Sequence, residues 1–203
     1  MKQTVLAIHG GHHYESHDAY LEYWKTREIH FDRMVPSDNW KNHLQEELGD
    51  DYTVLLPSMP SSDNAQYDEW KLWYERILSE LDCSLILVGH SLGAMFLSKY
   101  YSEHEPAHSV HGLFLVSGRY DGPDDDLYPD TSFTIKAPLD VLTKRAEHVV
   151  FFHSSDDPVV PYQSFEQYQK LVPDATFHSF TDRHHFIGPS FPEIVAEIQS
   201  LDA

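Results

Sequence analysis

The 203-residue chain has the composition of a folded protein, with 41% hydrophobic and 13% aromatic residues, which excludes a disordered chain. No apolar run approaches the roughly 20 residues that a membrane-spanning helix needs. Its 33 acidic and 14 basic residues give a formal net charge of −19, so we expect neither nucleic acid nor an anionic membrane surface as a partner.

The N-terminal stretch MKQTVLAIHGG contains an apolar run that is too short for a signal peptide and turns directly into a glycine loop. It therefore predicts a first strand, and we expect a cytoplasmic location. Cys83 is the single cysteine, which excludes an intrachain disulfide. The oligomeric state cannot be inferred from the sequence.

Short apolar segments recur along the chain and predict strands. They are Thr4–Ile8, Tyr52–Leu56, Ser84–Val88, Val110–Val116, His148–His153 and Ala175–Phe180. The third, fourth and fifth contain LILV, LFLV and VVFF, which are apolar at successive positions, as strands covered on both faces must be.

Amphipathic segments between these strands predict helices. Asp38 is expected to cap a helix over Asn39–Leu48 that stops at Gly49, and Asn64 or Asp63 to cap a longer one through Leu81. In the longer helix, Trp70, Trp73, Ile77 and Leu81 have helical spacing. Further helices are expected over Leu92–Glu103, Pro138–Arg145, Tyr162–Leu171 and Phe191–Leu201.

Strands that alternate with helices predict a parallel sheet with helices on both faces. Ligands of such sheets bind beyond the carboxyl ends of the strands, so the residues that follow each strand are the candidates for a site. Two segments, Tyr14–Ser37 and Gly118–Ala137, follow strand ends and are expected to overhang that site as partial lids.

The third strand is followed by Gly89-His90-Ser91-Leu92-Gly93, a G-x-S-x-G sequence. In a tight strand-to-helix turn of this kind the glycines avoid collisions with neighbouring elements and the serine hydroxyl is raised above the sheet edge. The N–H of Leu92, at the start of the next helix, then points to where an oxyanion would form. The sequence thus predicts Ser91 as a nucleophile.

Acidic residues and histidines follow the fifth and sixth strands. Asp156 and Asp157 are rival candidates for the acid that orients a histidine, and Pro158 restricts the backbone of Asp157. His184 and His185 are both placed to act as general base and then general acid. The order Ser, Asp, His after successive strands is the order of the α/β-hydrolase triad.

The first strand is followed by His9-Gly10-Gly11-His12, a glycine-rich turn. We expect the N–H of Gly11, with that of His12 as an alternative, to supply the second oxyanion donor. The turn lacks the G-x-G-x-x-G and Gly-Lys-Ser/Thr patterns of phosphate loops.

Several of these motifs together resemble the retinoblastoma-binding protein 9/YdeN-like serine hydrolases. They are GHSLGA at 89–94, SSDDPVVP at 154–161, TDRHHF at 181–186, and LPSMP at 56–60 with Trp70 downstream. The resemblance covers most of the chain. It implies a single α/β-hydrolase domain over residues 1–203, with about six mostly parallel strands in the order 2-1-3-4-5-6, helices on both faces and a minimal lid.

The resemblance also implies which residues of the rival pairs act. It carries the nucleophile onto Ser91, the acid onto Asp157, which precedes proline, and the base onto His185, which precedes phenylalanine. The family usually has glycine before the catalytic histidine, whereas this chain has His184. Its Tyr14–Ser37 segment is also longer than the family pattern.

The expected function is that of a serine hydrolase, a carboxylesterase-type enzyme that cleaves small acyl esters without a cofactor. Trp24, Phe31, Met59, Tyr120 and Tyr128 follow strands and are expected to line a small apolar pocket for the acyl substrate. The alternative is a non-catalytic interaction module on a hydrolase scaffold. Lyase or perhydrolase chemistry on the same fold is a third reading.

The 15 histidines raise a metal hypothesis, since His12, His13 and His17 lie close together in sequence and His184 and His185 can converge on them. No H-E-x-x-H or similar ligand pattern is present, so no metal is expected.

Overall fold

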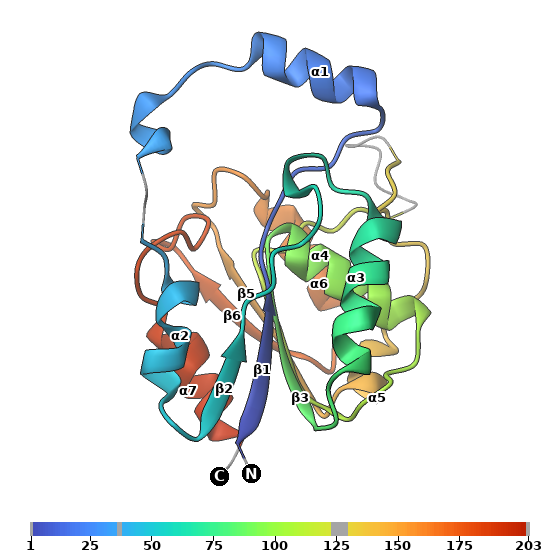
Figure 1. Cartoon of the computed structure of the whole chain (residues 1–203), viewed down its shortest axis with the longest axis vertical. Coiled ribbons are helices and arrows are strands. Elements are labelled where there is room, and N and C mark those ends of the chain that lie inside the picture. Colours follow the sequence, from blue (N-terminus) through green and yellow to red (C-terminus); the bar gives the residue numbers. More distant parts are fainter. Residues whose placement is uncertain (1, 36–37, 123–129, 202–203) are drawn as a thin grey trace.

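The computed structural model describes residues 2–35, 38–122 and 130–201, and a six-stranded sheet lies at its centre (Figure 1). The strands are β1 (Gln3–Ile8), β2 (Tyr52–Leu55), β3 (Leu85–His90), β4 (Val110–Val116), β5 (His148–Ser154) and β6 (Thr176–Phe180). Their order is β2-β1-β3-β4-β5-β6 and every neighbouring pair is parallel, which confirms the predicted α/β-hydrolase topology.

Helices cover both faces of this sheet (Figure 1). One face carries α2 (Trp40–Leu48) and α7 (Pro192–Ser200). The other carries α3 (Tyr67–Ser79), α4 (Leu92–Glu103), α5 (Leu142–Arg145) and α6 (Tyr162–Leu171). In the described ranges, no helix is long and apolar enough to cross a membrane.

The strand that leads to the serine is buried along its whole length. Leu85 and Leu87 of β3 pack into the core under α3 and α4, while Ile86 and Val88 pack into the core under α2 and α7. Side chains of a strand alternate between its two faces, so a strand between two helix layers must be apolar at every position. The continuous LILV run is explained by this placement.

The start of α2 differs from the prediction. Asn39, and not Asp38, is the N-cap, and its side chain accepts a hydrogen bond from the Lys41 N–H at 3.2 Å. The Asp38 carboxylate instead contacts His43 Nε2 at 2.6 Å. The predicted stop at Gly49 is confirmed, with a φ of 82° that favours glycine.

The helix α3 is shorter than predicted. Ser62–Asn64 form a separate 3-10 turn, and α3 begins at Tyr67 without a side-chain cap. The turn is separate because its backbone pairs with the loop after β1: Ser62 O accepts from the His12 N–H and Ala65 N–H donates to His12 O, both at 2.8 Å. The buried face of α3 consists of Tyr67, Trp70, Tyr74 and Leu78, so Trp73 points toward solvent.

The segment between β1 and α2 forms an arm (residues 15–35) above the carboxyl ends of the strands (Figure 1). It contains α1 (His17–Thr26), capped by Ser16, and the 3-10 turn η1 (Phe31–Met34). No residue of α1 is buried. The helix rests through the rings of Tyr20 and Tyr23 on Tyr14, and Tyr23 also contacts His12. Of the second predicted lid segment, Gly118–Ala137, residues 123–129 lie outside the described residues.

Candidate functional site

Ser91 occupies a strained turn between β3 and α4. Its φ of 56° and ψ of −119° lie in a region that non-glycine residues rarely adopt. Its N–H donates to Val116 O at 2.8 Å, and a side chain at Gly93 would collide with the Ile8 carbonyl oxygen. Strand contacts on both sides therefore fix the turn, which is the geometry of a nucleophile elbow.

His185 joins Ser91 to Asp157 in a continuous hydrogen-bonded chain. His185 Nε2 lies 2.9 Å from Ser91 Oγ, and His185 Nδ1 lies 2.8 Å from Asp157 Oδ2. The side chain of Asp157 is 0% exposed and that of His185 is 11% exposed. The structure thus brings together the three residues that the sequence placed after β3, β5 and β6.

The buried Asp157 carboxylate is kept ionised by its hydrogen bonds. Its second oxygen, Oδ1, accepts from the Val159 and Val160 N–H groups at 2.8 and 3.0 Å. Burial acts to raise the pKa of Asp157, but the His185 hydrogen bond and charge and the two backbone N–H groups outweigh it, so the pKa lies below its usual value. An ionised carboxylate at this position favours the Nδ1–H tautomer of His185, which leaves Nε2 free to accept the Ser91 proton.

The rival pair, Asp156 and His184, lies beside this chain and is held in a different arrangement. Asp156 accepts hydrogen bonds from Ser154 Oγ at 2.5 Å and from the His184 N–H at 2.9 Å, and its other oxygen contacts His184 Nδ1 at 2.8 Å. His184 has a φ of 48°, the left-handed region that favours glycine. The Asp156 contacts thus stabilise a non-glycine residue in a conformation that favours glycine.

The two predicted oxyanion donors, Gly11 and Leu92, line the same cavity as Ser91. Leu92 is the first residue of α4, and N–H groups of a first helical turn have no partner within the helix. The alternative donor, His12, is excluded because its N–H donates to Ser62 O at 2.8 Å. The glycine turn itself is braced by His9, whose Nδ1 lies 2.6 Å from Gly10 O and whose Nε2 accepts from the Met59 N–H.

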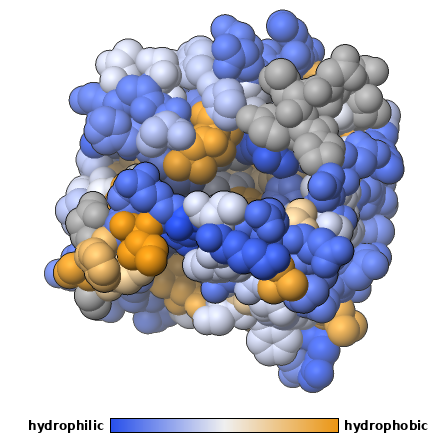
Figure 2. Space-filling view, turned by 90° about the horizontal axis from the view of Figure 1, so that it is seen from above, coloured by the Kyte–Doolittle hydropathy of each residue, from blue (hydrophilic) through white to orange (hydrophobic). Residues whose placement is uncertain are grey.

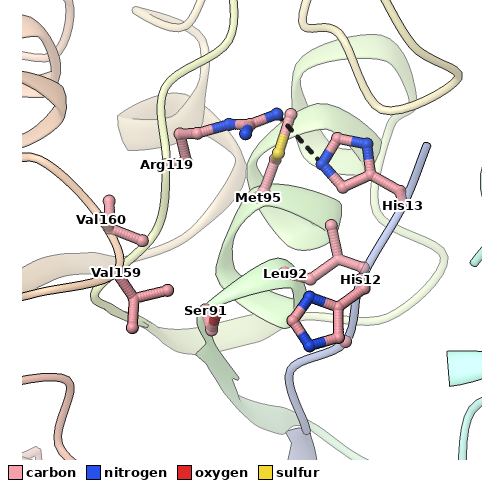
Figure 3. Close-up of a pocket in the computed structure, with 9 residues that line it drawn as sticks. His12, His13, Ser91, Leu92, Met95, Arg119, Val159 and Val160 are labelled. Atoms are coloured by element: carbon pink, nitrogen blue, oxygen red, sulfur yellow. Dashed lines mark hydrogen bonds between the residues drawn. The ribbon is translucent and has the colours of Figure 1, made fainter. Parts of the chain in front are cut away.

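A cavity of about 130 Å³ opens beside Ser91 (Figure 3). From above, the molecule is hollowed near the centre of this face, with hydrophobic residues on the rim (Figure 2). Among the described residues, those that line the cavity are Gly11, His12, His13, Ser91, Leu92, Met95, Arg119, Val159 and Val160.

The four predicted pocket residues that the structure describes do not line this cavity. Trp24 and Phe31 are on the arm and are exposed, Met59 is buried in the core, and Tyr120 packs against Tyr168. Tyr128 lies outside the described residues. The prediction failed because it assumed that aromatic residues after strands turn inward, whereas the arm carries two of them away from the sheet.

The structure engages several histidines of the metal hypothesis in other contacts. His13 Nε2 accepts from Arg119, His184 is held by Asp156, and the ring of His17 contacts Tyr20 of its own helix at a tilted angle. Within residues 2–35, 38–122 and 130–201, no group of three or more His, Cys, Asp or Glu side chains is arranged to hold a metal ion.

Two side chains whose contacts the sequence did not predict, the buried His90 and the half-buried Lys41, support the loop that carries His185. His90 Nε2 donates to the His185 carbonyl oxygen at 2.9 Å, and His90 Nδ1 accepts from Lys41 Nζ at 3.2 Å. Burial lowers the pKa of Lys41 to about 8. Burial and then the Lys41 charge hold the pKa of His90 well below its usual value, so this ring is neutral and its tautomer is set by the two contacts.

The start of α2 holds the same loop at two further carbonyls. Trp40 Nε1 donates to Phe186 O at 2.8 Å, and the Trp40 N–H donates to Gly188 O at 2.9 Å. Phe186, like His184, has a positive φ, so His185 lies between two strained residues. The side chain of His90 and the first turn of α2 together fix the backbone that positions His185.

The fold and the strained serine turn define the class of protein, an α/β-hydrolase with serine at the elbow. The sequence model of the serine hydrolase family matches residues 33–187. The chain belongs to that family.

Relatives and solved structures agree with this placement. The chain is 28% identical to serine hydrolase RBBP9 of Rattus norvegicus over 153 residues, which cover 74% of this chain and 78% of that protein. The ydeN gene product of B. subtilis has a similar fold, with a TM-score of 0.72 at 20% identity over 99% of both chains. Est1E of Butyrivibrio proteoclasticus, solved with ferulic acid, has a TM-score of 0.60 at 14% identity, over 98% of this chain and 88% of that one.

Proposed function

We propose that this serine hydrolase is a carboxylesterase-type enzyme that cleaves small acyl esters through an acyl-enzyme on Ser91. The observation that carries the proposal is the hydrogen-bonded chain from Ser91 through His185 to the fully buried Asp157, beside a cavity large enough for an acyl group. No step of this reaction needs a cofactor.

In the first half-reaction, His185 Nε2 takes the proton of Ser91 as Oγ attacks the ester carbonyl carbon. Asp157 holds the Nδ1–H of His185 and stabilises the imidazolium that forms. The N–H groups of Leu92 and Gly11 donate to the oxyanion of the tetrahedral intermediate. The intermediate collapses when His185 gives its proton to the alcohol oxygen, and the alcohol leaves.

In the second half-reaction, water attacks the acyl carbon of the Ser91 ester. His185 Nε2 takes the proton of this water and returns it to Ser91 Oγ as the acid leaves. The 11% exposure of the His185 side chain is consistent with this role, because the ring is largely shielded but not closed off from solvent.

A fluorophosphonate probe and a series of p-nitrophenyl esters test the proposal. Wild type is expected to be labelled and to hydrolyse short esters, whereas Ser91→Ala loses both properties. Ser155→Ala is the matched control, since Ser155 is an exposed serine near the site, and it should keep both. A wild-type protein that is neither labelled nor active would favour the interaction module instead, and equal labelling of Ser91→Ala would place the reactive group elsewhere.

A further inference from the structure

The cavity wall across from Ser91 carries a cation. Arg119 follows β4, and in Figure 3 it lies opposite Ser91 with its guanidinium extended toward His13. Arg119 Nη2 donates to His13 Nε2 at 3.1 Å and to Asp121 Oδ2 at 3.0 Å. The Arg119 side chain is 23% exposed and that of Asp121 is 1% exposed. An acyl group on Ser91 that extends into the cavity has its far end near this guanidinium.

Arg119 and Asp121 are held from behind by the core. Tyr168 of α6, which is buried, donates its hydroxyl to Arg119 O at 2.9 Å. The Ile135 N–H donates to Asp121 O at 2.7 Å. Because the backbone and the counter-ion are fixed before any ligand arrives, little ordering is needed when a ligand contacts Arg119.

Among the described residues, this wall pairs a hydrogen-bond donor with a counter-ion. The guanidinium is always protonated, and the Asp121 carboxylate balances it. Burial, and then the Arg119 charge, lower the pKa of His13 to about 3, so the ring is neutral at pH 7. An anionic group would have to be buried close to Asp121, against the field of a chain with a formal charge of −19. A neutral oxygen acceptor meets neither cost.

A short acyl chain is enough to fill the cavity. Its 130 Å³ is close to the roughly 150 Å³ of an engineered cavity that holds one benzene molecule, so it admits about six heavy atoms. Leu92, Met95, Val159 and Val160 give it apolar walls around the middle of such a chain. An acyl group that fits is therefore apolar along its length and polar at its far end.

We propose that the cavity selects short acyl groups with a neutral oxygen acceptor, such as a keto group, at the far end, and that Arg119 donates the selecting hydrogen bond. This inference rests on the acyl-enzyme function proposed above. An alkyl end at the same place would cover the guanidinium without offering an acceptor. Hydrogen bonds from a charged donor are strong enough for a preference of about 10- to 100-fold.

Three ethyl esters with acyl groups of nearly equal shape test the proposal: ethyl 4-oxopentanoate, ethyl 4-methylpentanoate and monoethyl succinate. They end in a ketone, an isopropyl group and a carboxylate. Ethanol release gives kcat/KM for each, divided by its alkaline hydrolysis rate to remove intrinsic reactivity. Wild type is expected to prefer the ketone by at least 10-fold over each of the other two.

Variants of Arg119 test whether this residue causes the preference for the ketone. Arg119→Met should bring the ketone-to-isopropyl ratio close to 1, while Arg76→Met, an exposed arginine on α3, should leave it unchanged. Because Arg119→Met leaves Asp121 buried without this partner, Arg119→Lys is measured beside it. Arg119→Lys keeps the cation but loses the planar fork, and its ratio should fall several-fold.

The outcomes separate this proposal from the esterase itself. If wild type hydrolyses the isopropyl ester as fast as the ketone, or the succinate fastest, the proposed selectivity is wrong and the esterase function stands. An unchanged ratio in folded Arg119→Met also overturns it. If no ester is hydrolysed and the fluorophosphonate does not label Ser91, the proposed function itself has failed.

Discussion

Replacing Asp157 by asparagine should be far more damaging than the same change at Asp156, and the hydrogen bonds around Asp157 show why. Oδ1 accepts from the N–H groups of Val159 and Val160, and Oδ2 from His185 Nδ1. In Asp157→Asn, the amide oxygen is held at the Oδ1 position by the two N–H groups, and the NH₂ group faces His185. The ring must then accept at Nδ1 and carry its hydrogen on Nε2, so it cannot take the Ser91 proton.

The size of the effect follows from the cost of turning the amide around. The active orientation would leave the two N–H groups facing NH₂, at about 1–3 kcal/mol for each unmet donor. A total of about 2–6 kcal/mol corresponds to a loss of roughly 30- to 10⁴-fold in kcat/KM. Asp156→Asn keeps an oxygen acceptor beside the loop and should lose less than about 10-fold, since Asp156 does not contact His185.

Initial rates on p-nitrophenyl acetate, with circular dichroism to confirm folding, measure both variants. Equal losses would show that Asp157 acts only as a loop constraint. A larger loss in Asp156→Asn would refute the assignment of the acid.

Three further changes test the surroundings of the site. The stability advantage of wild type over Lys41→Met should grow by about 3 kcal/mol between pH 8 and 10.5, because folding holds the pKa of Lys41 near 8 while unfolded lysine stays protonated to 10.5. Guanidinium unfolding at several pH values measures this change, with Lys25→Met, at an exposed lysine, as the control. Gly93→Ala should lower the free energy of unfolding by at least about 2 kcal/mol, because the added methyl group collides with Ile8 O. A methyl group at Gly188 contacts nothing, so Gly188→Ala should leave the thermal unfolding of the protein nearly unchanged. Trp40→Phe leaves Phe186 O without its donor, so it should lower the free energy of unfolding by about 1–3 kcal/mol and also lower kcat. The control, Trp73→Phe at an exposed tryptophan, should change neither quantity. A kcat unchanged by Trp40→Phe would show that this contact does not position His185.

The sheet and the meeting of Ser91, Asp157 and His185 could be predicted because their signals are local. An apolar run marks a strand buried on both faces, and parallel strands bring the residues at their carboxyl ends to one edge. The choice between Asp156 and Asp157 is different, because neighbouring residues in one loop have the same local signal. In the structure they differ in direction: Asp157 faces His185, and Asp156 turns to the backbone of His184.

The pocket and the support of the His185 loop could not be predicted from the sequence. Arg119 meets His13 across 106 positions of sequence, and Lys41 meets His90 across 49. Such contacts depend on the path of irregular loops, which has no periodicity. The same holds for the ends of α3, where pairing between His12 and the 62–65 turn overrode the helical pattern.

The exposed arm has a consequence for how this hydrolase can change over evolutionary time. Because α1 buries no residue, its sequence and length can vary at little cost in folding free energy; doubling the length of a flexible loop costs only about 0.6 kcal/mol. The elbow, the His185 loop and α2, by contrast, are bound to one another through the core. Insertions and deletions in the arm can therefore accumulate and alter which molecules reach the cavity, while the hydrolytic machinery beneath it is inherited unchanged.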